Sequence, residues 1–252
     1  MAKDSPSRLA RALFILVGLG LLGAAWLWPQ LPVRDGARID AGQGLTGVLC
    51  DGYVYAWVLQ TPHGAALVDA GADPQGKDLL EVLAARGVKP EQVHTVLVTH
   101  GHMDHWAAAH LFPRARVLVG PGETALIRGE YPQKSLGSRL VRFMKKPPLP
   151  SKIEEVQDGQ ELDVDGEKIR VITLPGHTPG SVAYLWRDVL FTGDALVHSH
   201  QGLTTSPTFL SEDNAESFES LRKLRDVSFS RTADGHAGLT TGAKEKLLET
   251  LK

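Results

Sequence analysis

The chain has almost no cysteine, since Cys50 is the only one in 252 residues. A single thiol can form no disulfide within the chain and no zinc site that needs several thiolates, whatever the compartment. We therefore interpret Cys50 as a small buried apolar residue.

The sequence also lacks an excess of charge of either sign. It has 27 Lys and Arg residues against 29 Asp and Glu residues, which gives a net charge of −2 and a pI of about 6.6. Nucleic-acid binding usually needs a concentrated basic surface, so no nucleic-acid partner is expected. Hydrophobic residues make up 42% of the chain, which suits one large globular domain or two small ones.

The first thirty residues differ in composition from the rest. Lys3, Arg8 and Arg11 precede an uncharged apolar run, residues 12–28, which ends in Trp26, Trp28 and a proline. As a helix this run would be roughly 25 Å long, slightly short of a ~30 Å hydrocarbon core. Positive charge before the run and tryptophans at its end predict a membrane anchor with the following domain outside the cytoplasm, periplasmic or extracellular.

A cleaved signal peptide is the alternative for this segment. Gly23 and Ala25 satisfy the small-x-small pattern of a cleavage site, in which case the protein would be secreted. The length of the run and its Trp-x-Trp-Pro ending favour the anchor. Residues 31–44 are interpreted as a linker, and residues 45–252 as the domain.

The domain alternates strand and helix patterns, which predicts an α/β architecture with helices layered on sheets. Residues 95–98 are continuously apolar, as expected of a fully buried strand. Strands are expected at 53–59, 65–68, 95–98, 116–119, 168–174, 182–186 and 189–191, and helices at 77–86, 106–110, 122–128, 215–224 and 243–251.

Ligand-type side chains crowd the end of the buried strand. Residues 99–105 read THGHMDH and supply His100, His102, Asp104 and His105. Imidazole and carboxylate ligands without thiolate suit zinc, iron or manganese. Four such residues so close together cannot all reach one ion in good geometry, which favours two adjacent ions.

Further candidate ligands follow later strands. His177 lies in LPGHTPG, Asp194 in FTGD and His236 in ADGHAG. Each stands at a predicted strand end or turn, so the second half of the chain could complete a site that the first half begins.

These motifs, in this order and with LVDAG (residues 67–71) before them, resemble those of the metallo-β-lactamase superfamily of hydrolases. The resemblance runs from about Tyr53 to the C-terminus. It implies a four-layer αββα sandwich with the metals in a cleft at one edge of the two sheets.

The resemblance also implies a role for each ligand. One metal ion would be bound by His100, His102 and His177, the second by Asp104, His105 and His236, and Asp194 would bridge both. Asp69 resembles a buried structural aspartate of the family and has no step assigned to it. The antibiotic-degrading members generally have cysteine or serine at the position of Asp194, whereas thioesterases, lactonases and phosphodiesterases have aspartate, so β-lactam hydrolysis is not expected.

Two zinc ions would yield a bridging hydroxide at neutral pH that attacks a carbonyl or phosphorus centre. Asp104 would both bind metal and orient the hydroxide proton, which makes it the predicted catalytic residue. Thr99 and Thr178 are interpreted as turn residues or as partners of the ligand histidines. The expected reaction is the hydrolysis of an ester-like bond (a thioester, lactone or phosphodiester) in a small-molecule or lipid-like substrate.

Two other functions stay open on the same residues. One is a mononuclear iron oxidoreductase of the persulfide-dioxygenase type, which would use a subset of the ligands. The other is a membrane-tethered binding module that keeps metal for structure only. Glyoxalase II shares the aspartate bridge and FTGD but uses an added C-terminal helical domain for glutathione. Because sixteen residues follow His236, glutathione thioesters are not the expected substrates.

An insert between the first and second halves, residues 121–152, is expected to flank the cleft. Its stretch 135–146 (SLGSRLVRFMKK) has an apolar side and a basic side as a helix. It is either a lid packed on the domain or a segment lying on an anionic membrane. His198 and His200 are placed in a loop, as a solvated pair or as cleft residues, and His63, His94 and His110 are given no role.

Overall fold

The computed structural model describes residues 28–141 and 145–252. The predicted anchor or signal segment lies outside the described residues, apart from Trp28–Gln30, which form the short 3-10 turn η1. Among the described residues, no helix is both long and apolar enough to cross a bilayer.

The first half of the chain forms a seven-stranded sheet. Strands β1 to β4 are antiparallel, and β4 to β7 are parallel. In spatial order the strands are β1 (Arg38–Gly42), β2 (Leu45–Cys50), β3 (Val54–Thr61), β4 (Gly64–Val68), β5 (Val93–Leu97), β6 (Arg116–Val119) and β7 (Ile153–Glu155).

The second half forms a six-stranded sheet and a small hairpin. Strands β9, β11 and β14 run in one direction, because β10 is antiparallel to β9 and β11 while β14 is parallel to β11. In spatial order the strands are β15 (Leu239–Thr241), β14 (Arg231–Asp234), β11 (Val189–Gly193), β10 (Val182–Trp186), β9 (Glu167–Thr173) and β8 (Glu161–Val164), and the hairpin pairs β12 (Val197–Ser199) with β13 (Gly202–Thr204).

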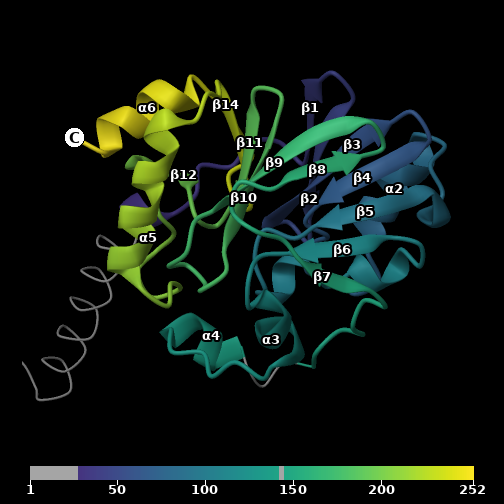
Figure 1. Ribbon diagram of the computed structural model, residues 1–252, viewed down its shortest axis with the longest axis horizontal. Coiled ribbons are helices and arrows are strands. Elements are labelled where there is room, and N and C mark those ends of the chain that lie inside the picture. The colour runs from purple at the N-terminus through teal and green to yellow at the C-terminus, as the bar shows by residue number, and fades with distance from the viewer. Residues whose placement is uncertain (1–27, 142–144) are drawn as a thin grey trace, which may run out of the picture.

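Helices cover the outer faces of the two sheets, which gives the expected four layers (Figure 1). Helix α2 (Lys77–Ala85) packs Leu79, Val82 and Leu83 on the first sheet. Residues of α6 (Ala243–Thr250) and of the 3-10 turn η5 (Leu221–Asp226), which follows α5 (Asn214–Ser220), pack on the second sheet. The inner faces of the sheets meet in an aromatic core that includes Tyr55, Trp57, Tyr184, Trp186 and Phe191.

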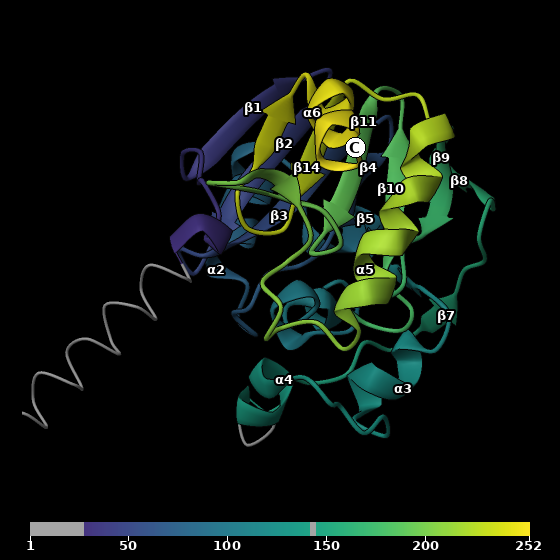
Figure 2. The ribbon, with the colours of Figure 1, turned by 90° about the vertical axis from the view of Figure 1, so that its left-hand side faces the viewer.

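Two further helices belong to the insert. They are α3 (Glu123–Arg128) and α4 (Leu136–Val141). Figure 2 shows α3 and α4 together beneath the sheets, at one end of the molecule. The predicted amphipathic helix over 135–146 is therefore only partly present: α4 ends at Val141, residues 142–144 lie outside the described part, and the chain from Lys145 to Pro150 has no regular structure.

The linker prediction is wrong for residues 38–42, which form β1 and pair with β2. The sequence RIDAG has no apolar run, because an edge strand exposes alternate residues to solvent. Strand β2 is also not predicted, although the domain is expected to begin at its first residue. The strands β7, β8 and β12 to β15 are missed because strands of three or four residues carry little pattern.

The helix predicted at 106–110 is wrong as well. The structure has two 3-10 turns there, η3 (Met103–His105) and η4 (Ala109–Leu111). The backbone of this stretch bonds to the segment after β4: Ala70 N–H donates to His105 O at 2.7 Å, and Ala107 N–H donates to Gly71 O at 3.1 Å. These tertiary bonds replace the hydrogen bonds of a continuous helix.

Candidate metal centre

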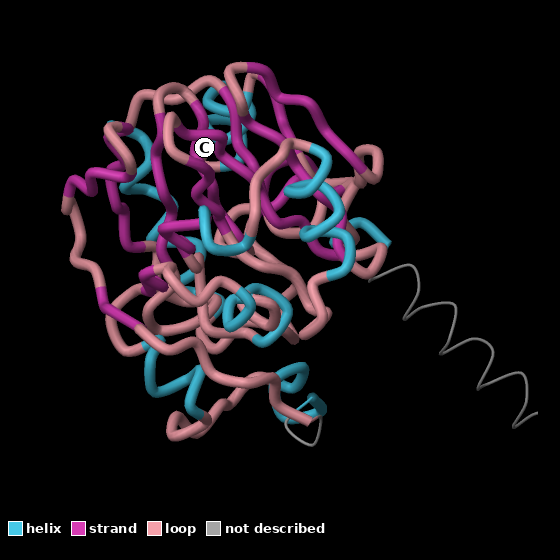
Figure 3. Tube along the Cα trace, turned by 90° about the vertical axis from the view of Figure 1, so that its right-hand side faces the viewer, coloured by secondary structure: helices cyan, strands magenta, loops and turns pink. Residues whose placement is uncertain are grey.

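The candidate ligands gather where strands of both sheets end. His100 follows β5, His177 follows β9, Asp194 follows β11 and His236 follows β14. Carboxyl ends of strands that run in one direction lie at the same edge of a sheet, so each sheet brings its ligands to one edge. Figure 3 shows the loops gathered at this end of the strands.

Three imidazole nitrogens form a tight triangle. His100 Nε2 lies 3.1 Å from His102 Nδ1 and 3.2 Å from His177 Nε2, and the last two nitrogens are 3.0 Å apart. In a tetrahedral zinc site with bonds of about 2.0 Å, neighbouring nitrogens are roughly 3.3 Å apart. This triangle, which joins the two halves of the chain, could therefore hold one ion.

A second group lies beside the triangle and consists of Asp104, His105 and His236. Asp104 Oδ2 is 3.8 Å from Nε2 of His105 and 3.8 Å from Nε2 of His236. The three ligand atoms lie within 4.8 Å of one another, a spacing that a single cation could bridge.

Asp194 lies between the two groups. Its Oδ2 is 3.5 Å from His177 Nε2 and 3.2 Å from His236 Nε2, while its Oδ1 is 3.4 Å from His105 Nε2. Two buried atoms at this point, His105 Nε2 and Asp194 Oδ1, have no hydrogen-bond partner. Buried polar atoms without partners are costly, and a bound cation would satisfy both, so the residues present fit a metal site.

The other ring nitrogen of four histidines is held in place. His100 Nδ1 is 3.2 Å from Thr99 Oγ1, and His177 Nδ1 is 3.3 Å from Ser211 Oγ. His236 Nδ1 is 2.7 Å from the carbonyl oxygen of Tyr53. Such contacts set which nitrogen faces the metal. The two threonines show the two predicted alternatives: Thr99 contacts a histidine ring, and the hydroxyl of Thr178 lies 2.7 Å from Ser181 Oγ, as in a turn.

Asp69 holds the fourth ring. Its Oδ2 is 2.8 Å from His105 Nδ1, and its Oδ1 accepts from Thr99 N–H at 2.8 Å. Asp69 is 1% exposed and has a φ of +58°, a left-handed conformation that is uncommon outside glycine. Its position matches the structural role that the sequence predicted.

The charge state of the site divides between the two groups. Burial lowers the pKa of His100 and brings that of His177 to about 3, so both rings are neutral with a lone pair for a cation. Burial also lowers the pKa of His105 and His236, but nearby carboxylates outweigh it and raise these values to about 9 and about 10. For Asp194, burial acts to raise the pKa, and the cationic His236 and His105 hold it well below its usual range.

Two buried carboxylates at the site were not predicted from the sequence. Asp234 accepts backbone N–H bonds from His236 at 2.8 Å and Ala237 at 2.6 Å, which fixes the loop that presents His236. Glu123, at the start of α3, accepts backbone N–H bonds from Gly101 and Gly180. Burial raises the pKa of Asp234 to about 6 and that of Glu123 to about 7. The DG turn was a signal for Asp234, but nothing in the local sequence pointed to Glu123.

A cavity of about 830 Å³ lies over the candidate ligands. His102, Asp104 and His236 line it, together with residues of the insert that include Leu126, Ile127, Tyr131, Gly137 and Arg139. Glu212 links the insert to the loop that carries His177. Its side chain accepts the N–H of Lys134 at 2.6 Å, and its own N–H donates to the His177 carbonyl oxygen at 3.0 Å.

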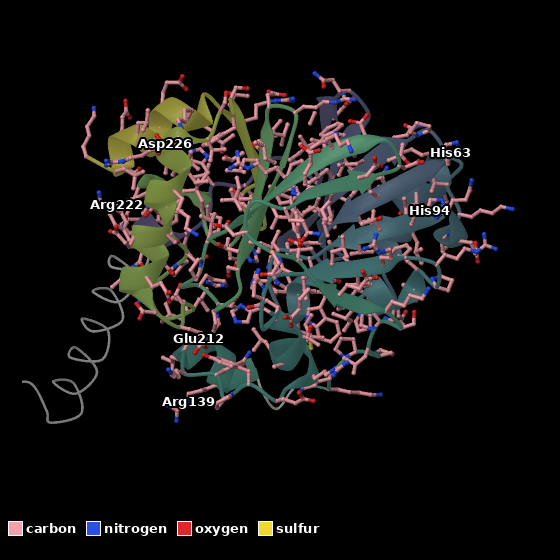
Figure 4. All side chains as sticks on the ribbon, viewed as in Figure 1. His63, His94, Arg139, Glu212, Arg222 and Asp226 are labelled. Carbon is pink, nitrogen blue, oxygen red and sulfur yellow. The ribbon has the colours of Figure 1, made fainter. Side chains whose placement is uncertain are left out.

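The remaining histidines lie elsewhere. Figure 4 places His63 and His94 at one edge of the molecule, away from Glu212 and Arg139. His198 lies on β12 rather than in a loop, and its N–H donates to Asp234 Oδ2 at 3.1 Å. The His200 ring stacks on Trp28 with 4.6 Å between centroids. Neither His198 nor His200 lines the cavity.

Comparison with solved structures agrees with this architecture. The chain superposes on the metallo-β-lactamase SMB-1 with a TM-score of 0.66 at 17% sequence identity, covering 86% of this chain and 93% of that one. At this identity the likeness concerns the fold alone.

Sequence comparison identifies relatives that are named as hydrolases. The chain is 28% identical over 242 residues to the "probable metallo-hydrolase YflN" of Bacillus subtilis, covering 85% of this chain and 91% of that protein. It is 30% identical over 176 residues to the hydroxyacylglutathione hydrolase of Vibrio cholerae, covering 68% of this chain and 56% of that protein. The chain thus spans about half the length of the hydroxyacylglutathione hydrolases that it matches.

The family model for the metallo-beta-lactamase superfamily matches residues 51–236, a range that begins before Asp69 and ends on His236. Together with the αββα layers and the grouped histidine and aspartate side chains, this match shows that the chain is an enzyme of the metallo-β-lactamase superfamily.

Proposed function

We propose that the protein is a hydrolase that binds two zinc ions and cleaves an ester-like bond, namely a thioester, lactone or phosphodiester. The observation that carries this proposal is the convergence of seven side chains into two adjacent groups with Asp194 between them. One group alone would suit one ion, whereas the shared carboxylate suits a pair.

Two bound cations would lower the pKa of a shared water towards neutrality and polarise the oxygen of the scissile group. The residues of the chain have separate tasks in that reaction. The two groups and Asp194 would hold the cations, and the carboxylate of Asp104, which lines the cavity, would accept a hydrogen bond from the attacking water and orient it. Asp69 and Asp234 keep His105 and His236 in position.

The cavity supports a substrate with an apolar portion next to the scissile bond. Met103, Trp106, Leu126, Ile127 and Leu210 contribute to its lining. A small-molecule or lipid-like acyl group would bury apolar surface against them, which favours binding by roughly 25 cal/mol per Å². The names of the hydroxyacylglutathione hydrolase relatives favour a thioester within this class. Asp194, in place of cysteine or serine, argues against β-lactam hydrolysis.

The test is a panel of acyl thioesters, lactones, phosphodiesters and a β-lactam, given to the zinc-loaded full chain in detergent. We expect turnover of at least one ester-like class, abolished by a chelator and reduced at least 100-fold in Asp104→Ala. Asp226→Ala, which changes an exposed aspartate near α6, is the matched control and should retain full activity (Figure 4).

Two results would contradict the proposal. Metal analysis of the purified protein, before zinc is added, that finds about one iron and no zinc per chain would support an oxidoreductase of the persulfide-dioxygenase type instead. Equal inactivity of the wild type and Asp104→Ala across the whole panel would support a binding module whose metal is structural.

We also propose that residues 12–28 anchor the enzyme in a membrane with the domain outside the cytoplasm. The support is the sequence itself, with basic residues before the apolar run and tryptophans at its end. Fractionation of cells that express the full chain tests this: we expect the protein in the membrane fraction and accessible to protease from the outer side. A protease-protected domain would contradict the orientation, and a soluble, shortened protein would indicate a cleaved signal peptide.

A further inference from the structure

Glu123 is a buried carboxylate that has no part in metal binding or in the proposed reaction. It is the first residue of α3 and is only 1% exposed. Burying an ionisable side chain this completely costs free energy unless its oxygens are hydrogen-bonded. The partners of Glu123 therefore indicate what the side chain is for.

The carboxylate joins two loops that come from different sheets. Its Oε2 accepts the N–H of Gly101, in the loop after β5. Its Oε1 accepts the N–H of Gly180 at 2.8 Å, in the loop after β9, and the Thr178 hydroxyl also hydrogen-bonds to the side chain. Because each oxygen accepts from a different loop, one side chain clamps both loops.

The clamped segments carry all three rings of the nitrogen triangle. Gly101 is the residue between His100 and His102, and Thr178 directly follows His177. The triangle closes across the two halves of the chain through separations of 3.0 Å and 3.2 Å. A small shift of either loop would therefore open it.

The packing around Glu123 leaves these loops little freedom. A Cβ atom on Gly101 would lie 2.7 Å from Glu123 Oε2, and one on Gly180 would lie 2.1 Å from the carbonyl oxygen of Pro121. Only glycine allows backbone and carboxylate to approach so closely. Both loops are thus built to contact the beginning of α3.

The second group is held by different residues. Asp69 holds the ring of His105, and the Tyr53 carbonyl holds that of His236. Asp69 also accepts hydrogen bonds from Thr99, whose hydroxyl contacts the His100 ring, so Asp69 supports both groups. Glu123 contacts the loops of the triangle, whereas Asp234 accepts the N–H of His236 in the second group. Mutation of these two carboxylates should therefore separate the affinities of the two positions.

We propose that Glu123 is a positioning residue that sets the geometry of the His100, His102 and His177 triangle and thereby the affinity of that metal position. The inference rests on the proposed metal centre and adds to it a set of hydrogen bonds that links the triangle to α3. Because Leu126 and Ile127 of α3 line the cavity, the same carboxylate also fixes the substrate wall relative to the metal.

The test is Glu123→Gln, which keeps the size of the side chain but replaces one acceptor oxygen with an NH₂ donor. We expect the zinc affinity of the triangle to fall 10- to 100-fold, as is typical when a partner outside the ligand set is lost. The affinity of the second position should stay within about twofold. A competitive titration with a chromophoric chelator measures both constants on the full chain, and the absorption spectrum of the cobalt-loaded protein reports which position has emptied.

Two further variants make the result specific. Glu130→Gln changes an exposed glutamate just after α3 and should bind zinc as the wild type does. Asp234→Asn should show the mirror pattern, with loss at the second position and not at the triangle, because Asp234 fixes the loop that presents His236. Excess zinc should restore the kcat of Glu123→Gln, which a general loss of structure would not allow.

The outcomes separate this inference from the proposed function. Unchanged zinc binding by Glu123→Gln, or equal losses at both positions, would overturn the role of Glu123 while hydrolysis by the wild type still stood. A wild type that binds a single zinc ion would contradict the dinuclear proposal; if the cobalt spectrum places that ion at the triangle, its weaker binding in Glu123→Gln would support the inference and unchanged binding would overturn it. If Glu123→Gln does not fold, Thr178→Val, which removes one hydroxyl, should weaken the triangle alone by a few fold.

Discussion

At the scale of single residues, the two nitrogens of each histidine ring have different tasks. In His105 one nitrogen contacts Asp69 and the other faces the metal position, and His236 divides its nitrogens between the Tyr53 carbonyl and the same position. Thr99, which contacts the His100 ring, directly precedes it in the sequence, so this contact could be predicted. Ser211 is 34 residues from His177, and this distance explains why no local motif indicated it.

The charges at the second group predict that metal binding is coupled to protons. Before a cation binds, neighbouring carboxylates raise the pKa of His105 to about 9 and that of His236 to about 10 against the opposing effect of burial. Both rings are therefore protonated on both nitrogens, and cationic, at pH 7. A cation needs the unprotonated nitrogen and must displace that proton. We therefore expect zinc affinity at this position to fall with decreasing pH and to rise until about pH 9 to 10.

Titration calorimetry in two buffers with different ionisation enthalpies measures the protons released. At pH 7 we expect a net release on zinc binding that shrinks as the pH approaches 10. His63→Ala is the control, because His63 is exposed and pairs with Asp165 away from the site. Zinc binding without proton release at pH 7 would show that these rings are neutral beforehand.

At the scale of elements, the contacts between a strand end and a neighbouring loop place the ligands. Gly193 has a φ of +49°, and a Cβ on it would lie 2.2 Å from Thr99 Oγ1, so the loop that carries Asp194 packs directly on the loop that carries His100. The sequence predicted most of the longer strands and α2, because their apolar patterns are clear. It failed at residues 106–110, where backbone bonds to the segment after β4 override the helical pattern.

The corner between β6 and α3 should tolerate no side chain at Gly120. A Cβ there would lie 1.8 Å from the carbonyl oxygen of Gly180, so Gly120→Ala has to push the His177 loop away from the insert. We expect a loss of about 1–3 kcal/mol in the free energy of unfolding, as for other overpacked sites. Weaker zinc binding at the triangle should accompany it.

Urea unfolding and the zinc titration measure these two effects. Gly36→Ala is the matched control, because the nearest atom to its added Cβ is 3.7 Å away, and it should change the unfolding free energy by less than about 0.5 kcal/mol. Wild-type stability and zinc binding in Gly120→Ala would mean that the two segments can separate without consequence.

At the scale of the whole molecule, the metal centre is formed only when the two sheets are packed together. The hydroxyl group of Tyr184, on the second sheet, donates towards two carbonyl oxygens of the first sheet at 3.1 Å each. One belongs to Val98, directly after β5, and the other to Leu118 in β6. Because His100 and His177 come from opposite halves, the unfolded chain holds no preformed triangle.

Metal should therefore stabilise the folded chain by mass action. With free zinc at about 1,000 times its dissociation constant, the gain is about 4 kcal/mol if the unfolded chain does not bind. We expect a chelator to lower the unfolding free energy of the wild type by an amount of this order, measured by urea denaturation.

Asp194→Ala provides the comparison, since it removes the carboxylate between the groups and should reduce the gain from zinc. Identical urea midpoints with zinc and with chelator in the wild type would contradict a metal centre shared by the two halves.

The sequence by itself determined the types of the candidate ligands, their order along the chain and their places at strand ends, because these follow from short motifs and apolar runs. It also determined the α/β layering through the alternation of strand and helix patterns. Only the tertiary structure decided which ring nitrogen faces the site and which buried carboxylates support it. Glu123 shows the reason: its partners Gly101 and Gly180 lie 22 and 57 residues away, and such contacts exist only once the two sheets and the insert have packed together.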